Sequence, residues 1–313
     1  MSNSLSSLLT IIESVDSFPY IENPYYWKFR SHDGALLGYI TPEIASRFID
    51  LPHSKYFEVD KLKKEVTIAG ALNDFEERNK VFAEIASDWR KSDDLLNKGW
   101  RDELYTVYYP RTKPYMLLER AFSCLLGVVT YGVHINGYIP AEKTKDKVLK
   151  MWIPRRSPTK ATYPGKLDNT IAGGLGYPYG LWENVVKECY EEGGLDADFV
   201  TKNITATGAV TYICQPYGPE GHAQPEIEYT YDLVFESEID NIPHPVDGEA
   251  ENFTLMTVEE VKQRMINGEF KPNCALVICD FLIRHGIITA ENEPNYLEVL
   301  SRLHRRFPFA TRN

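Results

Sequence analysis

Residues 172–195, AGGLGYPYGLWENVVKECYEEGGL, contain the pattern that decides the predicted fold of this chain. Two glycines precede a segment with helical spacing, and a Gly-Gly-Leu sequence closes it. Glu188, Glu191 and Glu192 are spaced i, i+3 and i+4, so a helix places the three carboxylates on one face. Like charges at that spacing repel each other, and a divalent cation that prefers oxygen ligands relieves the repulsion. The pattern favours a metal site, although an exposed acidic helix face is the usual explanation of a bare ExxEE.

Length and composition describe a globular protein of one or two domains. The chain has 313 residues, of which 43% are hydrophobic and 25% are charged, an ordinary balance. Its formal net charge of -11 predicts that neither nucleic acid nor an anionic membrane is a partner. Five cysteines without zinc spacing favour free thiols in a reducing compartment. We find no signal peptide and no apolar run long enough for a membrane span, so we expect a cytoplasmic protein.

The order of predicted elements changes near residue 126. Residues 1–125 show short helices and strands in an α+β pattern, including a strand over Tyr56–Ile68, without a recognisable group of reactive residues. In residues 126–313, β-rich runs are followed by the glycine loop, the acidic helix and further strands and helices. We therefore predict a small α+β N-terminal domain over 1–125 and an α/β domain over 126–313.

The glycine loop and the acidic helix together suit chemistry on a diphosphate. Glycines let the backbone approach a ligand closely, and a helix N-terminus offers free amides to an anion. Carboxylates at the same place can hold Mg²⁺ or Mn²⁺, which offsets the diphosphate charge and polarises water. The residues by themselves predict a Mg²⁺-dependent hydrolase of a small diphosphate-containing molecule, with no side-chain nucleophile.

The segment resembles a Nudix box, whose general form is G-x5-E-x7-R-E-U-x-E-E-x-G-U with U an aliphatic residue. Residues 187–195 match its second half, with Lys187 where the box has Arg and Cys189 at an aliphatic position. The first box Glu would fall at Tyr179, and the nearest carboxylate is Glu183. These departures resemble the Nudix subfamily related to the domain fused to thiamine pyrophosphokinase. Similar motifs occur over Tyr131–Tyr138, Trp152–Ser157, Tyr163–Gly174, Asp247–Glu249 and Phe270–Gly286.

The resemblance implies a Nudix α/β/α sandwich on a mixed sheet and a role for each matching residue. Glu188 and Glu192 would be the principal metal ligands, and Glu191 a third ligand or a base acting through water. Lys187 would hold the acidic side chains in place, and the Gly173 carbonyl could be a further ligand. Glu249 would be the glutamate that many Nudix enzymes add from outside the box, although a turn carboxylate facing water explains it equally well.

Several other side chains are candidates for contact with the substrate. Arg155, Arg156 and Lys160 could bind phosphate oxygens as cationic donors, or be surface charges at a strand end. His134 could line the pocket, but a buried structural histidine is the more common case. Trp182 and Tyr177 could stack on a heteroaromatic ring, or belong to the core. The basic residues Arg302, His304, Arg305 and Arg306 are interpreted as a solvated helix face.

The resemblance extends to the substrate class, which is thiamine diphosphate or its oxidised analogues, oxothiamine and oxythiamine diphosphates. These would be cut to the monophosphate and phosphate. Two alternatives stay open: a Nudix hydrolase of another nucleoside diphosphate derivative such as ADP-ribose, and a catalytically lapsed Nudix binding module. The partner is a small-molecule diphosphate, and a homodimer is left open.

Overall fold

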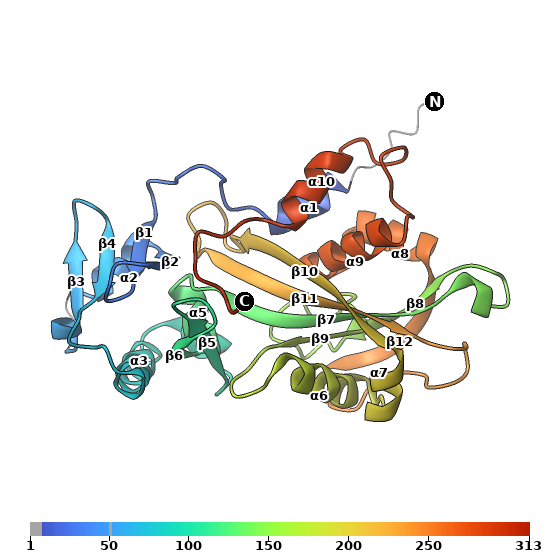
Figure 1. Ribbon diagram of the computed structural model, residues 1–313, viewed down its shortest axis with the longest axis horizontal. Helices are drawn as coiled ribbons and strands as arrows, with labels where there is room; N and C mark the ends of the chain where they lie inside the picture. The colour runs from blue at the N-terminus through green and yellow to red at the C-terminus, as the bar shows by residue number, and fades with distance from the viewer. Residues whose placement is uncertain (1–7, 50–51) are drawn as a thin grey trace.

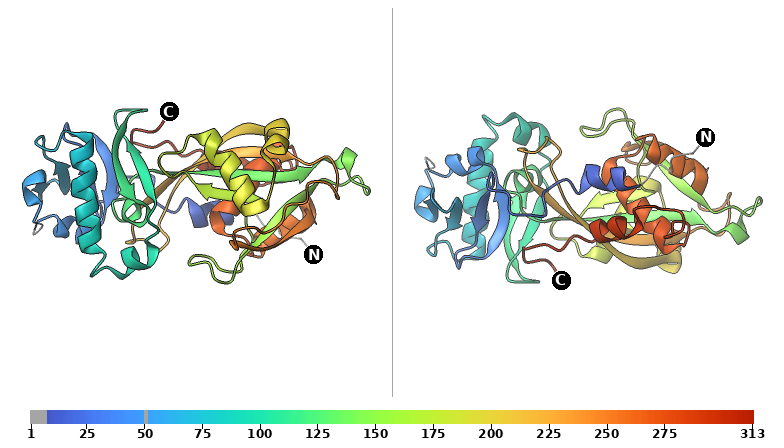
Figure 2. Two further views of the ribbon diagram at one scale, coloured as in Figure 1. Left: turned by 90° about the horizontal axis from the view of Figure 1, so that it is seen from below. Right: turned by 90° about the horizontal axis from the view of Figure 1, so that it is seen from above.

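The computed structural model describes residues 8–49 and 52–313 and shows two lobes lying end to end (Figures 1 and 2). The first lobe contains a four-stranded sheet of order β2-β1-β4-β3 and a separate hairpin. Its strands are β1 (Trp27–Arg30), β2 (Leu36–Ile40), β3 (Phe57–Asp60), β4 (Glu65–Ile68), β5 (Leu104–Tyr108) and β6 (Pro114–Glu119). Its helices are α2 (Pro42–Arg47), η1 (Ser54–Tyr56), α3 (Phe75–Trp89), α4 (Asp94–Gly99) and α5 (Arg120–Leu125). The predicted α+β character of this part is confirmed.

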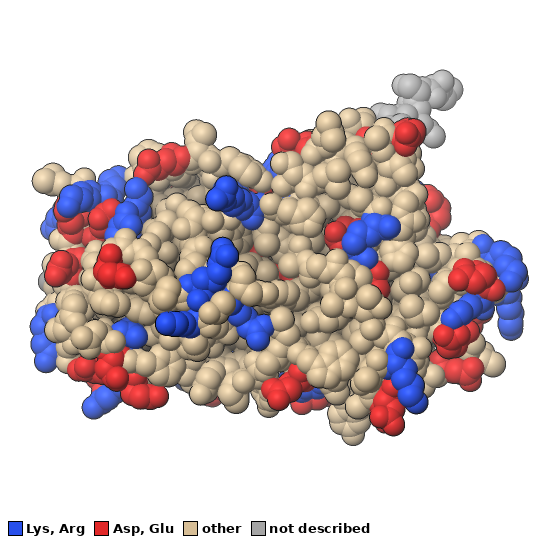
Figure 3. All heavy atoms as spheres, in the orientation of Figure 1, with Lys and Arg blue, Asp and Glu red and all other residues tan. Residues whose placement is uncertain are grey.

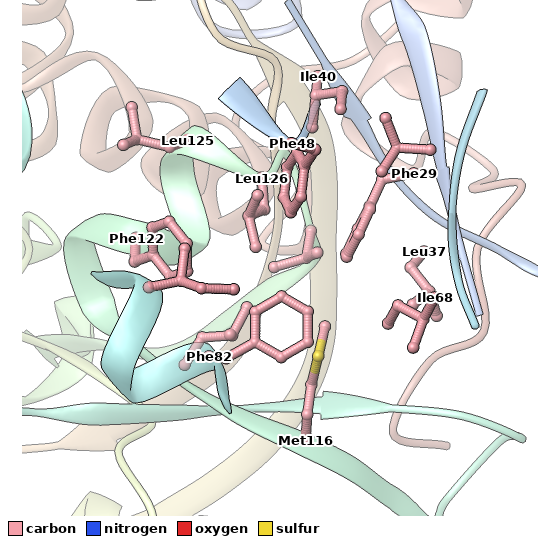
Figure 4. Packing of buried hydrophobic residues seen from close by; sticks show 14 of the residues in the cluster. Phe29, Leu37, Ile40, Phe48, Ile68, Phe82, Met116, Phe122, Leu125 and Leu126 are labelled. Atoms are coloured by element: carbon pink, nitrogen blue, oxygen red, sulfur yellow. The ribbon is translucent and has the colours of Figure 1, made fainter. Parts of the chain in front are cut away.

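An aromatic core holds the first lobe together. Phe82 of α3 packs edge-on against Phe29, and Phe48 stacks on Phe29 (Figure 4). Phe82 also packs edge-on against Phe57. The start of α3 is set by Asp74, whose carboxylate accepts a hydrogen bond from the Glu77 N–H at 3.0 Å, as N-cap residues do. The strand predicted over Tyr56–Ile68 is in fact the antiparallel hairpin of β3 and β4.

The second lobe is an α/β/α sandwich around a mixed sheet, as the sequence predicts. The sheet has the order β10-β11-β7-β8-β12, and β9 pairs with β7 at its side. β11 runs parallel to β7, and the other neighbours are antiparallel. Its strands are β7 (Thr130–Ile139), β8 (Lys150–Arg156), β9 (Ile171–Gly174), β10 (Ile204–Cys214), β11 (Gln224–Val234) and β12 (Ala250–Thr257). The short helix η2 (Ala141–Lys143) follows β7.

Helices cover both faces of this sheet (Figure 1). One face is covered by α6 (Leu181–Gly193) and α7 (Ala197–Asn203). The other is covered by α1 (Leu9–Val15), α8 (Val258–Ile266), α9 (Pro272–Arg284) and α10 (Tyr296–Leu303). The N-terminal helix α1 thus packs in the second lobe, although it precedes the first lobe in the chain. The boundary at residue 125 stays a prediction.

The surface mixes both signs of charge. On the face drawn in Figure 3, acidic and basic side chains are interspersed over both lobes. Many form exposed ion pairs, such as Lys143 with Glu236, and such pairs contribute little to stability. Of the helices in the described residues, none is both long and apolar enough to cross a membrane.

Candidate active site

The acidic helix is α6, and the glycine loop positions it against the sheet. Val185 and Cys189 are fully buried against β7, so the apolar side of the helix faces the core. The Asn184 amide donates a hydrogen bond to the Gly174 carbonyl at 3.1 Å, which ties the helix to β9. Glu183 accepts a hydrogen bond from the Gly180 N–H at 3.0 Å. The carboxylate nearest to the missing first box position therefore caps the helix.

Glu192 and Glu188 lie along the flank of α6 that faces β9. Glu192 Oε2 accepts a hydrogen bond from the Ala172 N–H at 2.9 Å. Burial, and then the negative charge of Glu188, raise the pKa of Glu192 well above its usual value. The Glu188 carboxylate occupies the space where a Cβ on Gly173 would lie, and burial raises its pKa as well. Two carboxylates are thus held close together where charge is costly.

Lys187 lies between two of the predicted metal-site glutamates. Its Nζ is 3.0 Å from Glu188 Oε1 and 2.8 Å from Glu191 Oε2. Burial lowers the pKa of Lys187, but hydrogen bonds to Glu191 and Glu188 outweigh burial and raise it. This geometry is what the predicted holding role of Lys187 requires. Glu191 is about half exposed, at 48%, so it faces solvent at the rim of the site.

Glu249 lies just before β12 and close enough to act on the α6 carboxylates. Its charge contributes to the raised pKa of both Glu188 and Glu192. Its Oε2 is 2.5 Å from Lys160 Nζ, and its backbone carbonyl accepts a hydrogen bond from the Ser157 N–H at 2.8 Å. The structure therefore brings Glu249 and Lys160 together, next to the acidic helix.

The two predicted arginines hold a loop of the protein itself. Arg156 donates to Asp168 at 2.6 Å and to the backbone carbonyls of Tyr163 and Thr162. Arg155 donates to the Gly165 carbonyl at 2.8 Å. These contacts account for both guanidinium groups without a phosphate. Of the three predicted phosphate-binding cations, Lys160 is the one that pairs with Glu249.

His134 and the predicted aromatic residues are separated from the carboxylates. His134 is buried on the opposite face of the sheet, where Nδ1 lies 2.7 Å from Asn169 Oδ1 and Nε2 lies 3.4 Å from a Glu228 oxygen. Trp182 and Tyr177 are 44% and 50% exposed near the start of α6. Because six residues correspond to about 600° of helical rotation, Trp182 and Glu188 point to different sides. Their contact with substrate stays a prediction.

Sequence reasoning missed a second polar group, formed by the buried Glu228 and the partly buried Glu226 and Lys271. The signal was present, because Glu226 and Glu228 are separated by one residue in a largely apolar strand. Side chains at that spacing point to the same face of a sheet. Asp168 is also buried, and its charge contributes to the raised pKa of Glu192.

The fold and this group of carboxylates define the class of protein: an α/β/α enzyme whose glycine loop and acidic helix suit hydrolysis of a diphosphate. A family model described as "Domain of unknown function (DUF4743)" matches residues 29–130. The chain is 42% identical to the "Uncharacterized protein YJR142W" of Saccharomyces cerevisiae, over 98% of this chain and 93% of the yeast protein.

Two plant proteins identify the family. Nudix hydrolase 24, chloroplastic, of Arabidopsis thaliana is 34% identical over 86% of this chain and 73% of its own length. Nudix hydrolase 20, chloroplastic, of the same plant is 38% identical over 79% of this chain and 63% of its own length. Among solved structures, that of DR0079 from Deinococcus radiodurans is 19% identical, with a TM-score of 0.35, over 47% of this chain and 80% of that one. The chain belongs to the Nudix hydrolase family and is a hydrolase of diphosphate bonds.

Proposed function

We propose that this enzyme is a metal-dependent diphosphatase of thiamine diphosphate or of its oxidised analogues, oxothiamine and oxythiamine diphosphates. The products would be the monophosphate and phosphate. The observation that carries the proposal is the convergence of Glu188 and Glu192 beside Gly173, with Glu249 near enough for its charge to raise their pKa values.

The donor atoms suit Mg²⁺ or Mn²⁺, which prefer oxygen ligands. Repulsion between Glu188 and Glu192 contributes to the raised pKa of Glu192, and a divalent cation would remove that repulsion. Among the described residues, no three His, Cys, Asp or Glu side chains already form a cluster that could hold an ion, and the Lys187 ammonium is paired with Glu188 and Glu191. Glu188, Glu191, Glu192 and the Gly173 carbonyl would hold the metal. When bound, the metal would offset phosphate charge and lower the pKa of water.

The chain's own residues would divide the remaining work. Glu191 or Glu249 would accept the proton of the attacking water, since both lie at the exposed edge of the site. Lys160, which is paired with Glu249, would bind a phosphate oxygen. Lys187 would keep the acidic side chains oriented. Its single ammonium replaces the Arg fork of the box, so it fixes their geometry less tightly.

The thiamine assignment is supported by the sequence motifs that resemble the thiamine-related subfamily. In the structure these motifs form β7, the loop that ends in β9, and α9, all around the same part of the sheet. A cytoplasmic location and the absence of nucleic-acid and membrane partners stay predictions. A homodimer stays open, and light scattering after size exclusion would decide it.

A substrate panel tests the proposal. Thiamine diphosphate, oxothiamine diphosphate, oxythiamine diphosphate and ADP-ribose are compared by kcat/KM for phosphate or monophosphate release, with Mg²⁺ and with a chelator. We expect metal-dependent turnover and a preference for a thiamine compound. A preference for ADP-ribose above about tenfold, or roughly 1.4 kcal/mol in transition-state binding, would contradict the thiamine assignment. Absence of turnover on every compound would indicate a lapsed module.

A further inference from the structure

A pair of carboxylates lies on the sheet face that packs against α9, on the side away from α6. The hydroxyl of Tyr212 on β10 donates hydrogen bonds to Glu226 and Glu228 of β11. The Tyr212 oxygen lies 3.0 Å from Glu228 Oε1. Tyr212 is fully buried and Glu228 is 6% exposed, whereas Glu226 is only partly buried. Two neighbouring carboxylates with little solvent around them carry a desolvation cost. The His134 imidazole, 3.4 Å from Glu228, offsets that cost for Glu228, whereas Glu226 is hydrogen-bonded by the Tyr212 hydroxyl.

Residues at the start of α9 bring hydrogen-bond donors and a positive charge to these carboxylates. The Asn273 amide donates to Glu228 Oε1 at 3.4 Å, and Cys274 Sγ lies 2.6 Å from Asp168 Oδ1. Lys271, at the N-cap of α9, is partly buried, and its positive charge acts to lower the pKa of Asp168, Glu226 and Glu228. For Glu226, burial and the negative charge of Glu228 outweigh this effect and raise the pKa to about 7. Within residues 8–49 and 52–313, no ion pair engages Lys271. Its ammonium is therefore available to a ligand.

This cluster is continuous with the α6 carboxylates. A Cβ on Gly132 would overlap the Glu228 carboxylate and lie 3.2 Å from the Gly173 carbonyl oxygen, so both groups border the same point. Asp168 contacts Cys274 on one side, and its charge reaches Glu192 on the other. The Glu228 carboxylate therefore lies near β9, the strand beside which Glu188 is held.

Two tyrosines from separate loops border the cluster. Tyr163 and Tyr217 are 40% and 60% exposed. Burial raises the pKa of Tyr163, and the charges of Lys271 and Glu226 also act on it, while Tyr163 in turn acts on the pKa of Tyr217. Exposed flat rings beside hydrogen-bonding groups are a common way to hold a heteroaromatic ring.

We propose that Lys271 and Glu226 form the ring-recognition end of the substrate site and select a heteroaromatic ring that carries a keto oxygen next to a ring N–H. The proposal rests on the diphosphatase function above. The Lys271 ammonium donates to the keto oxygen, and the Glu226 carboxylate accepts from the ring N–H. An amino ring places an N–H donor opposite Lys271 and a bare ring nitrogen opposite Glu226. Both contacts are then lost, and the groups left unpaired penalise the wrong ring.

This ring chemistry has two sources: the pyrimidinone of oxythiamine diphosphate, or a keto nucleobase. The experiment therefore uses two matched pairs, oxythiamine diphosphate against thiamine diphosphate and UDP against CDP. Within each pair the ring differs in its keto or amino group. For Lys271→Met, Glu226→Gln and wild type, the keto/amino ratio of kcat/KM is measured with Mg²⁺. The ratio does not depend on the fraction of folded enzyme, so partial misfolding of a variant leaves the test intact.

We expect the wild-type enzyme to prefer the keto member of at least one pair. Each variant should lower the keto/amino ratio of kcat/KM by about tenfold or more, because each loses one hydrogen bond that involves a charged group. The change should lie mainly in KM, because the ring is bound alike before and during the reaction. A loss confined to UDP and CDP assigns the site to a nucleobase. The controls Lys202→Met and Glu58→Gln, at exposed positions, should leave both ratios unchanged.

Two results would overturn the inference. One is a wild-type preference for the amino member of both pairs. The other is a ratio within about twofold of wild type in both variants. In either case metal-dependent turnover itself would still support the diphosphatase function. Absence of turnover on every diphosphate, by contrast, would remove the proposed function first.

Discussion

At the scale of single residues, burial gives the α6 carboxylates their chemical character. Glu188, Glu191 and Glu192 have similar places in the sequence pattern, but they differ in burial and in their contacts. Glu192 is held by the Ala172 N–H, and burial raises its pKa well above the usual value. Glu188 lies against Gly173, and Glu191 faces solvent. The two inner carboxylates are therefore the ones that a metal would stabilise most.

Glu192→Gln and Glu188→Gln should each lower kcat by at least ~10²-fold, because each removes a charge that acts on the transition state but little volume. Steady-state kinetics with Mg²⁺ on the preferred substrate measure the effect, and circular dichroism checks the fold. Glu183→Gln is the matched control, since Glu183 lies on the same helix but caps its start. Near-normal turnover in either variant would show that α6 does not carry the metal site.

His134 should stabilise the fold in a pH-dependent manner. Burial lowers its pKa, but the Glu228 carboxylate and Cys274 raise it well above the ordinary value of 6.5. The stabilising contribution is therefore complete below that ordinary value and is lost as the pH rises through the folded-state pKa. The partner Glu228 has its pKa lowered to about 2, mainly by His134, against the opposing effect of burial. Glu228 thus contributes above its ordinary value of 4.5 and loses its contribution as the pH falls toward 2.

Urea unfolding of wild type and His134→Gln at about pH 6 and about pH 9 tests this sign. The destabilisation by the substitution should be larger at the lower pH. Equal destabilisation at both values would show that the His134–Glu228 contact does not depend on the imidazolium charge.

At the scale of elements, glycines decide how closely β9 and α6 approach. Gly173 and Gly132 are strand positions where a side chain would meet a carboxylate, Glu188 in one case and Glu228 in the other. The sequence pattern shows the double glycine but not which carboxylate fills the space. Because Gly173 has no Cβ, β9 and the Glu188 side chain of α6 can lie close together.

Gly173→Ala should lower kcat by about tenfold or more, because the new Cβ displaces the Glu188 carboxylate from its place beside β9. Gly180→Ala is the matched control: its Cβ would come no closer than 3.6 Å to Glu183 Oε2, and its φ is −75°. Activity and Tm are measured for both. Equal activity of the two variants would contradict the importance of the close approach.

At the scale of the whole molecule, the two ends of the chain hold each other. Arg305 is 8% exposed, and its guanidinium lies 2.8 Å from Asp16, which is fully buried after α1. It also donates to the carbonyls of Phe18 and Pro19. Arg302 joins the same carboxylate at 3.5 Å. The basic segment interpreted from the sequence as a solvated face is therefore partly buried, because it pairs with a residue almost three hundred positions away.

Arg305→Met should destabilise the protein by about 3–5 kcal/mol, the usual result of leaving one partner of a buried ion pair uncompensated. Arg306→Met, at the exposed neighbouring position, should change the free energy of unfolding by less than about 0.5 kcal/mol. Urea denaturation measures both. The double variant Asp16→Asn/Arg305→Met should be less than additive, and full additivity would contradict the pairing.

The sequence by itself determined the features that depend on neighbours along the chain. The spacing of Glu188, Glu191 and Glu192 set one helix flank, because it follows from local helix geometry. The glycine loop, the order of elements and the family motifs were visible for the same reason. These patterns were enough to predict the α/β/α sandwich and the acidic helix of the candidate site.

The tertiary structure alone decided which distant residues meet. The charge of Glu249 acts on Glu188 of α6, and Arg156 forms an ion pair with Asp168. The helix α1 packs in the second lobe. Tyr56–Ile68 became a hairpin, since a turn between two short strands leaves little periodic signal. The Lys271–Glu226 end forms where the start of α9 meets β11, elements separated by almost forty residues. Burial and long-range electrostatics are properties of the packed molecule, so no local pattern could have revealed them.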